Sequence, residues 1–241
     1  MTFHPDGGGG GSKVTPYNLS AVPLNQAVSD YGNGQTIVGG LPNGLVSRDV
    51  GGRFTSIVDD GVTARFEVAA GGTGLTVGDA ALNDSIIHSP SPLMGDCEVT
   101  VKMGAEDVAN PWRDFGPVLF WGNASSKTGW TGAVMLTYGN NKGVFGGRAS
   151  FAGGFSSGTF SSAIQSVSPF WMKLLVQGGV LKCFNGGTGA SPSWVQQGSD
   201  LQMSANGSVF YAGVLMYAKT ATQYFNIESL EINGYEYTND P

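Results

Sequence analysis

The chain has 241 residues, of which 39 are glycine and only 12% are charged, and its formal net charge is −6. Such a length suffices for one large core, and a scarcity of Glu, Lys and Arg among Val, Phe, Tyr, Thr and Gly favours strands and tight turns over helices. The sequence has no basic stripe for a nucleic-acid backbone and no apolar run of about 20 residues for a bilayer, so we expect no nucleic acid and no membrane as partner.

The segment GGGGGSK, which begins at Gly7, has the composition of a phosphate-binding loop. Such a loop needs a glycine, four residues, and then Gly-Lys-Ser/Thr. Counted from Gly7, these three positions fall on Ser12, Lys13 and Val14, so two of them fail. Pro16 also disfavours the helix that would have to start here. We therefore interpret the segment as flexible polyglycine.

Residues 1–47 are predicted to form an extended N-terminal arm, because they are rich in Gly and Pro and show no sustained period. The arm is too apolar for a solvated linker, since it would leave a sticky strip in water. We expect it to anchor on another surface, such as a neighbouring subunit. The expected anchoring residues are Tyr17, Leu19, Val22, Leu24, Val28 and Tyr31.

Short strands follow one another in residues 48–241, which we assign to a single β-sandwich domain. Two alternating runs around Asp60-Gly61 predict a hairpin. The segment DCEVTVKM, residues 96–103, alternates apolar and polar residues and predicts a strand with one buried face. About twelve strands without a helical period predict two packed antiparallel sheets. The later strands are expected in GPVLFWG, GAVMLTYG, GVFGGRAS, FWMKLLVQGG, VLKCFNGG, SWVQQG, VFYAGVLMYA and YFNIESLEING.

The two cysteines, Cys97 and Cys183, lie within apolar alternating runs. A free thiol in such a run behaves as a small buried hydrophobe, so we expect two buried thiols rather than a disulfide. The N-terminus shows no basic region followed by an apolar stretch, and we expect folding in a cytoplasm.

Three long segments carry a family resemblance: residues 88–103, HSPSPLMGDCEVTVKM; residues 115–139, FGPVLFWGNASSKTGWTGAVMLTYG; and residues 170–198, FWMKLLVQGGVLKCFNGGTGASPSWVQQG. Their order, completed by two final strands, resembles the concanavalin A-like lectin and glucanase sandwich, especially its laminin-G-like and DUF1349-like branches. The resemblance covers about residues 50–235. It implies an all-β fold, a two-sheet antiparallel jelly-roll sandwich. It also matches Trp171 and Trp194 to strand positions of the family, and we interpret these two, with Trp121, as packing residues.

Catalytic residues are not expected. Glycosidases with this fold carry two Glu and one Asp alternating on one strand, because the acid and the nucleophile need their carboxyl groups roughly 5 Å apart for retention. No such trio occurs: Glu98 stands alone on its strand, and Glu228 and Glu231 are three apart, which predicts opposite faces. Neither His4 nor His88 has a Ser or Cys partner in a recognisable motif. These observations argue against an enzyme.

No metal site is expected either, although loop Asp and Asn residues in VGDAALNDS and AEDVANPWRD leave room for a calcium ion, which relatives of this fold often hold. No ordered ligand spacing is present, and turn formation explains the same residues. We therefore predict no cofactor.

Aromatic residues on expected loops and strand ends are the candidates for ligand binding. Sugar rings stack their C–H faces on Trp and Tyr, while neighbouring polar groups bond the hydroxyls. Loop anchoring is the alternative role for the same residues. The glycan-binding candidates are Trp112, Arg113, Trp130, Tyr138 and Asn140.

These features suggest, as a first hypothesis, a non-enzymatic structural component of a bacteriophage particle. Capsid decoration proteins and tail appendages combine an arm with a lectin-like module, and this chain looks like one of them. It would dock through the arm and lie in the virion after assembly in the host cytoplasm. Its partners would be other virion proteins and sister subunits, as a homotrimer. The alternative is a carbohydrate-binding module that recognises a glycan, a host glycan included, through the loop aromatics.

Overall fold

The computed structural model describes residues 13–22, 45–49, 53–59, 64–70, 85–104, 113–120, 133–138, 142–147, 156–160, 170–202, 209–218 and 221–238. No helix within these residues is long and apolar enough to cross a bilayer. The strands are β1 (Lys13–Val22), β2 (Val46–Asp49), β3 (Phe54–Asp59), β4 (Ala64–Val68), β5 (Ser85–His88), β6 (Leu93–Met94), β7 (Cys97–Met103), β8 (Arg113–Phe120), β9 (Ala133–Tyr138), β10 (Lys142–Gly147), β11 (Ser156–Phe160), β12 (Phe170–Gln177), β13 (Val180–Gly187), β14 (Val195–Gln202), β15 (Val209–Ala218) and β16 (Gln223–Thr238).

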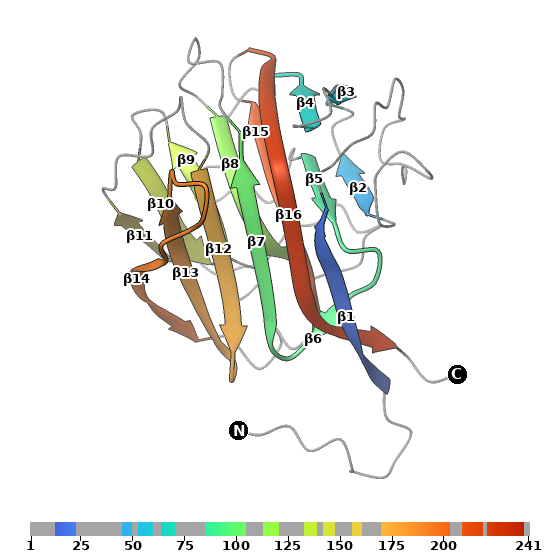
Figure 1. Ribbon diagram of the computed structural model, residues 1–241, viewed down its shortest axis with the longest axis vertical. Coiled ribbons are helices and arrows are strands. Elements are labelled where there is room, and N and C mark those ends of the chain that lie inside the picture. The colour runs from blue at the N-terminus through green and yellow to red at the C-terminus, as the bar shows by residue number, and fades with distance from the viewer. Residues whose placement is uncertain are drawn as a thin grey trace.

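The strands form two layers (Figure 1). The front sheet has the order β3-β4-β16-β7-β12-β13-β14, with β1 also paired to β16. The back sheet has the order β2-β5-β15-β8-β9-β10-β11. The pairings are antiparallel, and the short strand β6 joins the layers by pairing with both β15 and β16. The predicted all-β, two-sheet jelly roll is confirmed, as is the hairpin of β3 and β4.

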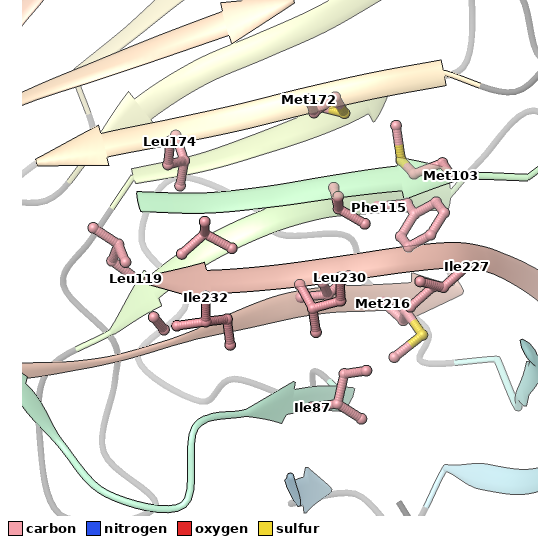
Figure 2. Packing of buried hydrophobic residues seen from close by; sticks show 14 of the residues in the cluster. Ile87, Met103, Phe115, Leu119, Met172, Leu174, Met216, Ile227, Leu230 and Ile232 are labelled. Carbon is pink, nitrogen blue, oxygen red and sulfur yellow. The ribbon is translucent and has the colours of Figure 1, made fainter. Parts of the chain in front are cut away.

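The core lies between the two sheets (Figure 2). Strand β12 shows why: Phe170, Met172, Leu174 and Val176 are buried, whereas the residues between them keep part of their surface in solvent. This two-residue period follows from the pleat, which points successive side chains to opposite faces. Strand β7 repeats the period, except that Thr100 on its outer face is also buried. Cys97 and Cys183 are free, buried thiols as expected.

A β-bulge changes which residues of β16 face the core. Its pairing with β7 shifts register between Ile227 and Ser229, so the buried positions change from Phe225 and Ile227 to Leu230 and Ile232. A bulge inserts one unpaired residue and reverses the alternation beyond it. Strict alternation along the sequence does not reveal this change of face.

Strand β1 belongs to the segment predicted as an arm, and it pairs along β16 from Lys13 opposite Thr238 to Val22 opposite Leu230. Pro16 lies within β1. Proline has no N–H to donate to a ladder, and an edge strand tolerates this because one of its two sides has no partner strand. Leu24, Val28 and Tyr31 lie outside the described residues. The domain boundary at residue 47, which falls within β2, stays a prediction.

The outer face of the back sheet is covered at β15. Leu215 and Tyr217 alternate with the core-facing residues of this strand, yet both are buried. Part of the cover is Arg53, whose guanidinium carbon lies 5.8 Å from the centroid of the Tyr217 ring. At these positions the back sheet presents no open surface to a ligand.

Candidate functional site

The outer face of the front sheet carries three partly exposed aromatic residues, Trp171, Phe184 and Trp194, which we call the aromatic platform. Trp171 lies on β12 and Phe184 on β13, while Trp194 immediately precedes β14. The two indoles meet edge to face, with ring centroids 6.5 Å apart. None of the three belongs to the core cluster. The platform therefore lies on the wet side of the sheet.

A glycine lets the two indoles approach each other. The pairing of β12 with β13 shifts register beside Trp171, and Gly186 is the extra residue between Asn185 and Gly187. A Cβ atom at Gly186 would lie 2.7 Å from Trp171 Cβ and 2.7 Å from Trp194 Cζ3. Only a residue without a side chain fits beneath both rings.

Hydrogen bonds of the loop between β13 and β14 hold both indoles in place, one from the backbone beside Trp194 and one from the Trp171 side chain. The Ser193 amide donates to the Gly186 carbonyl at 2.9 Å, and Trp171 Nε1 donates to the Gly189 carbonyl at 2.9 Å. The turn itself is fixed by the Gly187 amide, which donates to Asn185 Oδ1 at 2.7 Å. These bonds order the platform before any ligand arrives.

Two lysines lie against the platform. Lys173 Nζ is 4.6 Å from the Trp194 ring centroid and 5.2 Å from that of Phe184. Lys102 Nζ is 5.5 Å from the Trp171 centroid. Ammonium groups at this range are attracted to the negative face of an aromatic ring. The contacts therefore fix the lysine side chains and the rings relative to each other.

Carboxylates complete the surface. Glu98 Oε2 lies 3.3 Å from Lys173 Nζ, and Thr100 Oγ1 donates to Glu98 Oε1 at 3.3 Å. Glu228 Oε2 lies 2.5 Å from Lys102 Nζ. The prediction that Glu228 and Glu231 occupy opposite faces is wrong: the bulge in β16 turns both outward, because Leu230 and Ile232 point into the core.

The residues predicted from sequence as glycan contacts are described only in part. Arg113 begins β8 and Tyr138 ends β9, and these neighbouring strands run antiparallel, so both positions lie at one end of the back sheet. Trp112, Trp130 and Asn140 lie outside the described residues, and so does Trp121. Their role in binding stays a prediction.

His88 is a buried part of the back sheet, 2% exposed. Its Nδ1 donates to the Ser89 carbonyl at 2.7 Å, and its ring meets that of Tyr211 edge on at 5.2 Å between centroids. Burial raises the pKa of the Tyr211 hydroxyl. Within the described residues no group of three His, Cys, Asp or Glu side chains is placed to hold a metal ion. The loops named above as calcium candidates lie almost wholly outside them.

The platform itself was missed, because Trp171 and Trp194 were interpreted as packing residues. A signal was present in the sequence FWMKLLVQ, where Trp171 shares its parity with Lys173 and not with Met172 or Leu174. Residues of one parity share one face of a strand, and a lysine marks the wet face. Trp171 therefore had to lie beside Lys173.

No family model matches the sequence, and no curated protein matches it either. Solved structures do share its fold. A functionally unknown protein from Saccharomyces cerevisiae matches with a TM-score of 0.53 and 9% identity, over 82% of this chain and 97% of the other. Alginate lyase A1-II′, a member of polysaccharide lyase family 7, matches with a TM-score of 0.52 and 9% identity, over 76% of this chain and 82% of the other. At such identities the match establishes the fold, the concanavalin A-like jelly roll.

These matches overturn two expectations. The prediction of a non-enzymatic structural protein of a phage particle is contradicted, because the fold is shared with alginate lyases, which are carbohydrate-active enzymes, and nothing indicates a phage protein. The expectation that the protein is not an enzyme is contradicted by the same matches. It rested on the missing glycosidase carboxylates and on histidines without a Ser or Cys partner, which argues against particular hydrolytic mechanisms and not against the lyases that share this fold. The homotrimer and the virion location stay predictions.

Proposed function

We propose that the protein binds a polysaccharide on the outer face of the front sheet, through the aromatic platform. The observation that carries the proposal is the group of Trp171, Phe184 and Trp194 on one partly exposed face: the two indoles meet edge to face, and Lys173 lies against both Phe184 and Trp194. Sugar rings stack their C–H faces on such rings, and amphipathic side chains suit a site that stays partly wet.

The polar groups around the platform supply the rest of a sugar site. Carboxylates are strong acceptors for hydroxyl groups, and Glu98 and Glu228 are held on this face by their lysines. A sugar bound over the rings can therefore donate hydrogen bonds to fixed oxygens. Preorganised acceptors reduce the entropy lost on binding.

The structural comparisons support the ligand class. An alginate lyase with this fold has been solved in complex with its substrate, with a TM-score of 0.52 over 76% of this chain and 81% of the other. A jelly roll of these proportions can thus present a surface to a polysaccharide chain. The position of the site on this protein comes from the platform and not from that enzyme.

Affinity electrophoresis of the full chain through gels that contain single polysaccharides tests the proposal. We expect retardation by at least one polymer, and Trp194→Ala to weaken the affinity about tenfold, which corresponds to about 1.4 kcal/mol. Val195→Ser is the matched control, because Val195 is the next residue, is 59% exposed and has no ring. Its affinity should equal that of the unmodified chain.

Trp130→Ala provides the comparison with the loop aromatics. If this variant loses the affinity and Trp194→Ala retains it, the ligand binds elsewhere and the platform proposal is wrong. Thermal melts of each variant separate lost binding from lost folding. Because alginate lyases share the fold, ultraviolet absorbance of unsaturated sugar ends in the same mixtures shows whether bound polymer is also cleaved.

A further inference from the structure

We infer that the ligand of the aromatic platform is a neutral polysaccharide, not an acidic one. This inference rests on the proposed function and names the substrate class of the same site. It departs from the polymer that the alginate lyases act on. It rests on the ion pairs around the aromatic platform. Arg65 of β4 also points outward on this sheet, but it stacks on the Tyr224 ring at 3.7 Å and makes no contact with the platform that would draw an anion there.

The lysines on this face already have anionic partners. In the part of the chain whose side chains are described, three lysine side chains are seen, and each is ion-paired: Lys102 with Glu228, Lys173 with Glu98, and Lys182 with Asp200 at 4.0 Å. A uronate carboxylate would have to displace a protein carboxylate that stays tethered nearby. The exchange leaves the two carboxylates close to each other, and their repulsion cancels most of the binding free energy gained from the lysine.

In two of these pairs the acidic side chain is more exposed to solvent than the lysine side chain. The Lys173 side chain is 13% exposed and that of Glu98 33%. Lys182 is 29% exposed and Asp200 45%. Lys173 is also shielded by the rings of Phe184 and Trp194. At these two pairs an approaching chain meets the carboxylate first, whereas in the third pair Lys102 is 23% exposed and Glu228 18%.

The chain as a whole adds to this effect, because its formal net charge is −6. A polyanion is repelled at long range by a protein of the same sign, most strongly at low salt. Neutral sugars suffer no such penalty. Their hydroxyls donate to carboxylates, and Glu98 is oriented for this by Thr100 and Lys173.

The test measures the affinity of the full chain for two groups of polymers, by the same electrophoresis at two ionic strengths. The neutral probes are β-1,3-glucan, xylan and mannan, and the acidic probes are alginate and polygalacturonate. The ionic strengths are about 0.01 and 1 M, between which the Debye length falls from roughly 30 to 3 Å. We expect at least one neutral polymer to bind, with an affinity that changes less than about twofold with salt, and no acidic polymer to bind at low salt.

The outcomes separate this inference from the proposed function. If the chain binds an acidic polymer at low salt and loses it at high salt, the inference of a neutral ligand is wrong, while the proposed binding of a polysaccharide still stands. Retardation by none of the five polymers overturns the proposed function itself.

The variant Glu98→Gln sharpens the distinction, because it keeps the shape of the side chain and removes its charge. On the neutral reading it weakens binding several-fold, since a strong acceptor for sugar hydroxyls is lost. On the acidic reading it strengthens binding, since a repulsive charge is lost. An increase in affinity for an acidic polymer would therefore refute the inference by a second route.

Discussion

Gly186 is the position where one methyl group should damage the platform. A Cβ atom there would lie 2.7 Å from Trp171 Cβ, 2.7 Å from Trp194 Cζ3 and 2.8 Å from Pro192 Cβ. Carbon atoms in contact normally lie about 3.5–4.0 Å apart, so Gly186→Ala overlaps all three neighbours. Trp171 Cβ is joined directly to the backbone of β12 and cannot move away without moving the strand.

Overpacking of this kind costs about 1–3 kcal/mol of folding free energy. For a chain of this size each kcal/mol lowers the melting temperature by about 2–4 °C, so we expect a loss of about 2–12 °C. Affinity for the polysaccharide should fall as well, because the indoles must move apart. Differential scanning calorimetry and affinity electrophoresis measure the two effects.

Gly234→Ala is the control for inserting a methyl group. A Cβ at Gly234 would lie 3.4 Å from Cys97 Cβ and 3.4 Å from Leu93 Cδ1, which is ordinary contact. Its stability should change by less than about 1 kcal/mol, with binding unaffected. If Gly186→Ala has the same melting temperature and the same affinity as this control, the two indoles do not pack over Gly186 as described.

Three further predictions concern the rest of the fold. Burial raises the pKa of the Cys97 and Cys183 thiols, and the charge of Glu98 adds to the effect at Cys97. Ellman's reagent should therefore react with both thiols only after the chain unfolds. Rapid reaction of the folded chain would refute their burial. Burial also raises the pKa of Tyr211 above its ordinary value of 10.0, so the folded state holds this proton more tightly. The stability this provides is full below that pH and is lost as the pH rises through the folded pKa, so chemical denaturation should show a steeper alkaline loss for the unmodified chain than for Tyr211→Phe. Deletion of residues 1–22 removes β1 and leaves one edge of β16 unpaired from Leu230 to Thr238, so we expect the truncated chain to self-associate. Light scattering should show this as a size that grows with concentration. A monodisperse truncated chain with an unchanged melting temperature would contradict the pairing of β1 with β16.

The sequence predicted the fold well because its strands alternate cleanly. In β7 and β12 every second residue is apolar, and the pleat converts that pattern into one buried face and one wet face. The hairpin of β3 and β4 was predicted by turn residues that accept positive φ. In each case the information is local, so a single sequence contains it.

Two features were not predictable from local pattern. The bulge in β16 adds one unpaired residue, and its position depends on the pairing with β7, which local alternation does not reveal. Strand β1 contains Pro16 and shows no clean alternation, and it is a strand because β16 offers it an edge. Tertiary pairing decided both.

The sequence and the structure point to two different candidate sites of the same kind. Aromatic recognition of a sugar is predicted from sequence at Trp112, Trp130 and Tyr138, and this stays a prediction. We propose it instead at Trp171 and Trp194, whose indoles meet on the partly exposed face of the front sheet. Both indoles had been interpreted as packing residues because they matched strand positions of the sandwich family. Membership of a strand does not fix the face, and the parity shared with Lys173 does.

The most direct test of the account is the titration of the full chain with the retained polysaccharide, cut to oligosaccharides, while the indole N–H signals are followed by NMR. The chain has five tryptophans, and single Trp→Phe variants assign their signals. The account predicts that the signals of Trp171 and Trp194 shift with saturation, while those of Trp112 and Trp130 stay in place. Shifts confined to Trp112 and Trp130 would contradict the aromatic platform as the binding site.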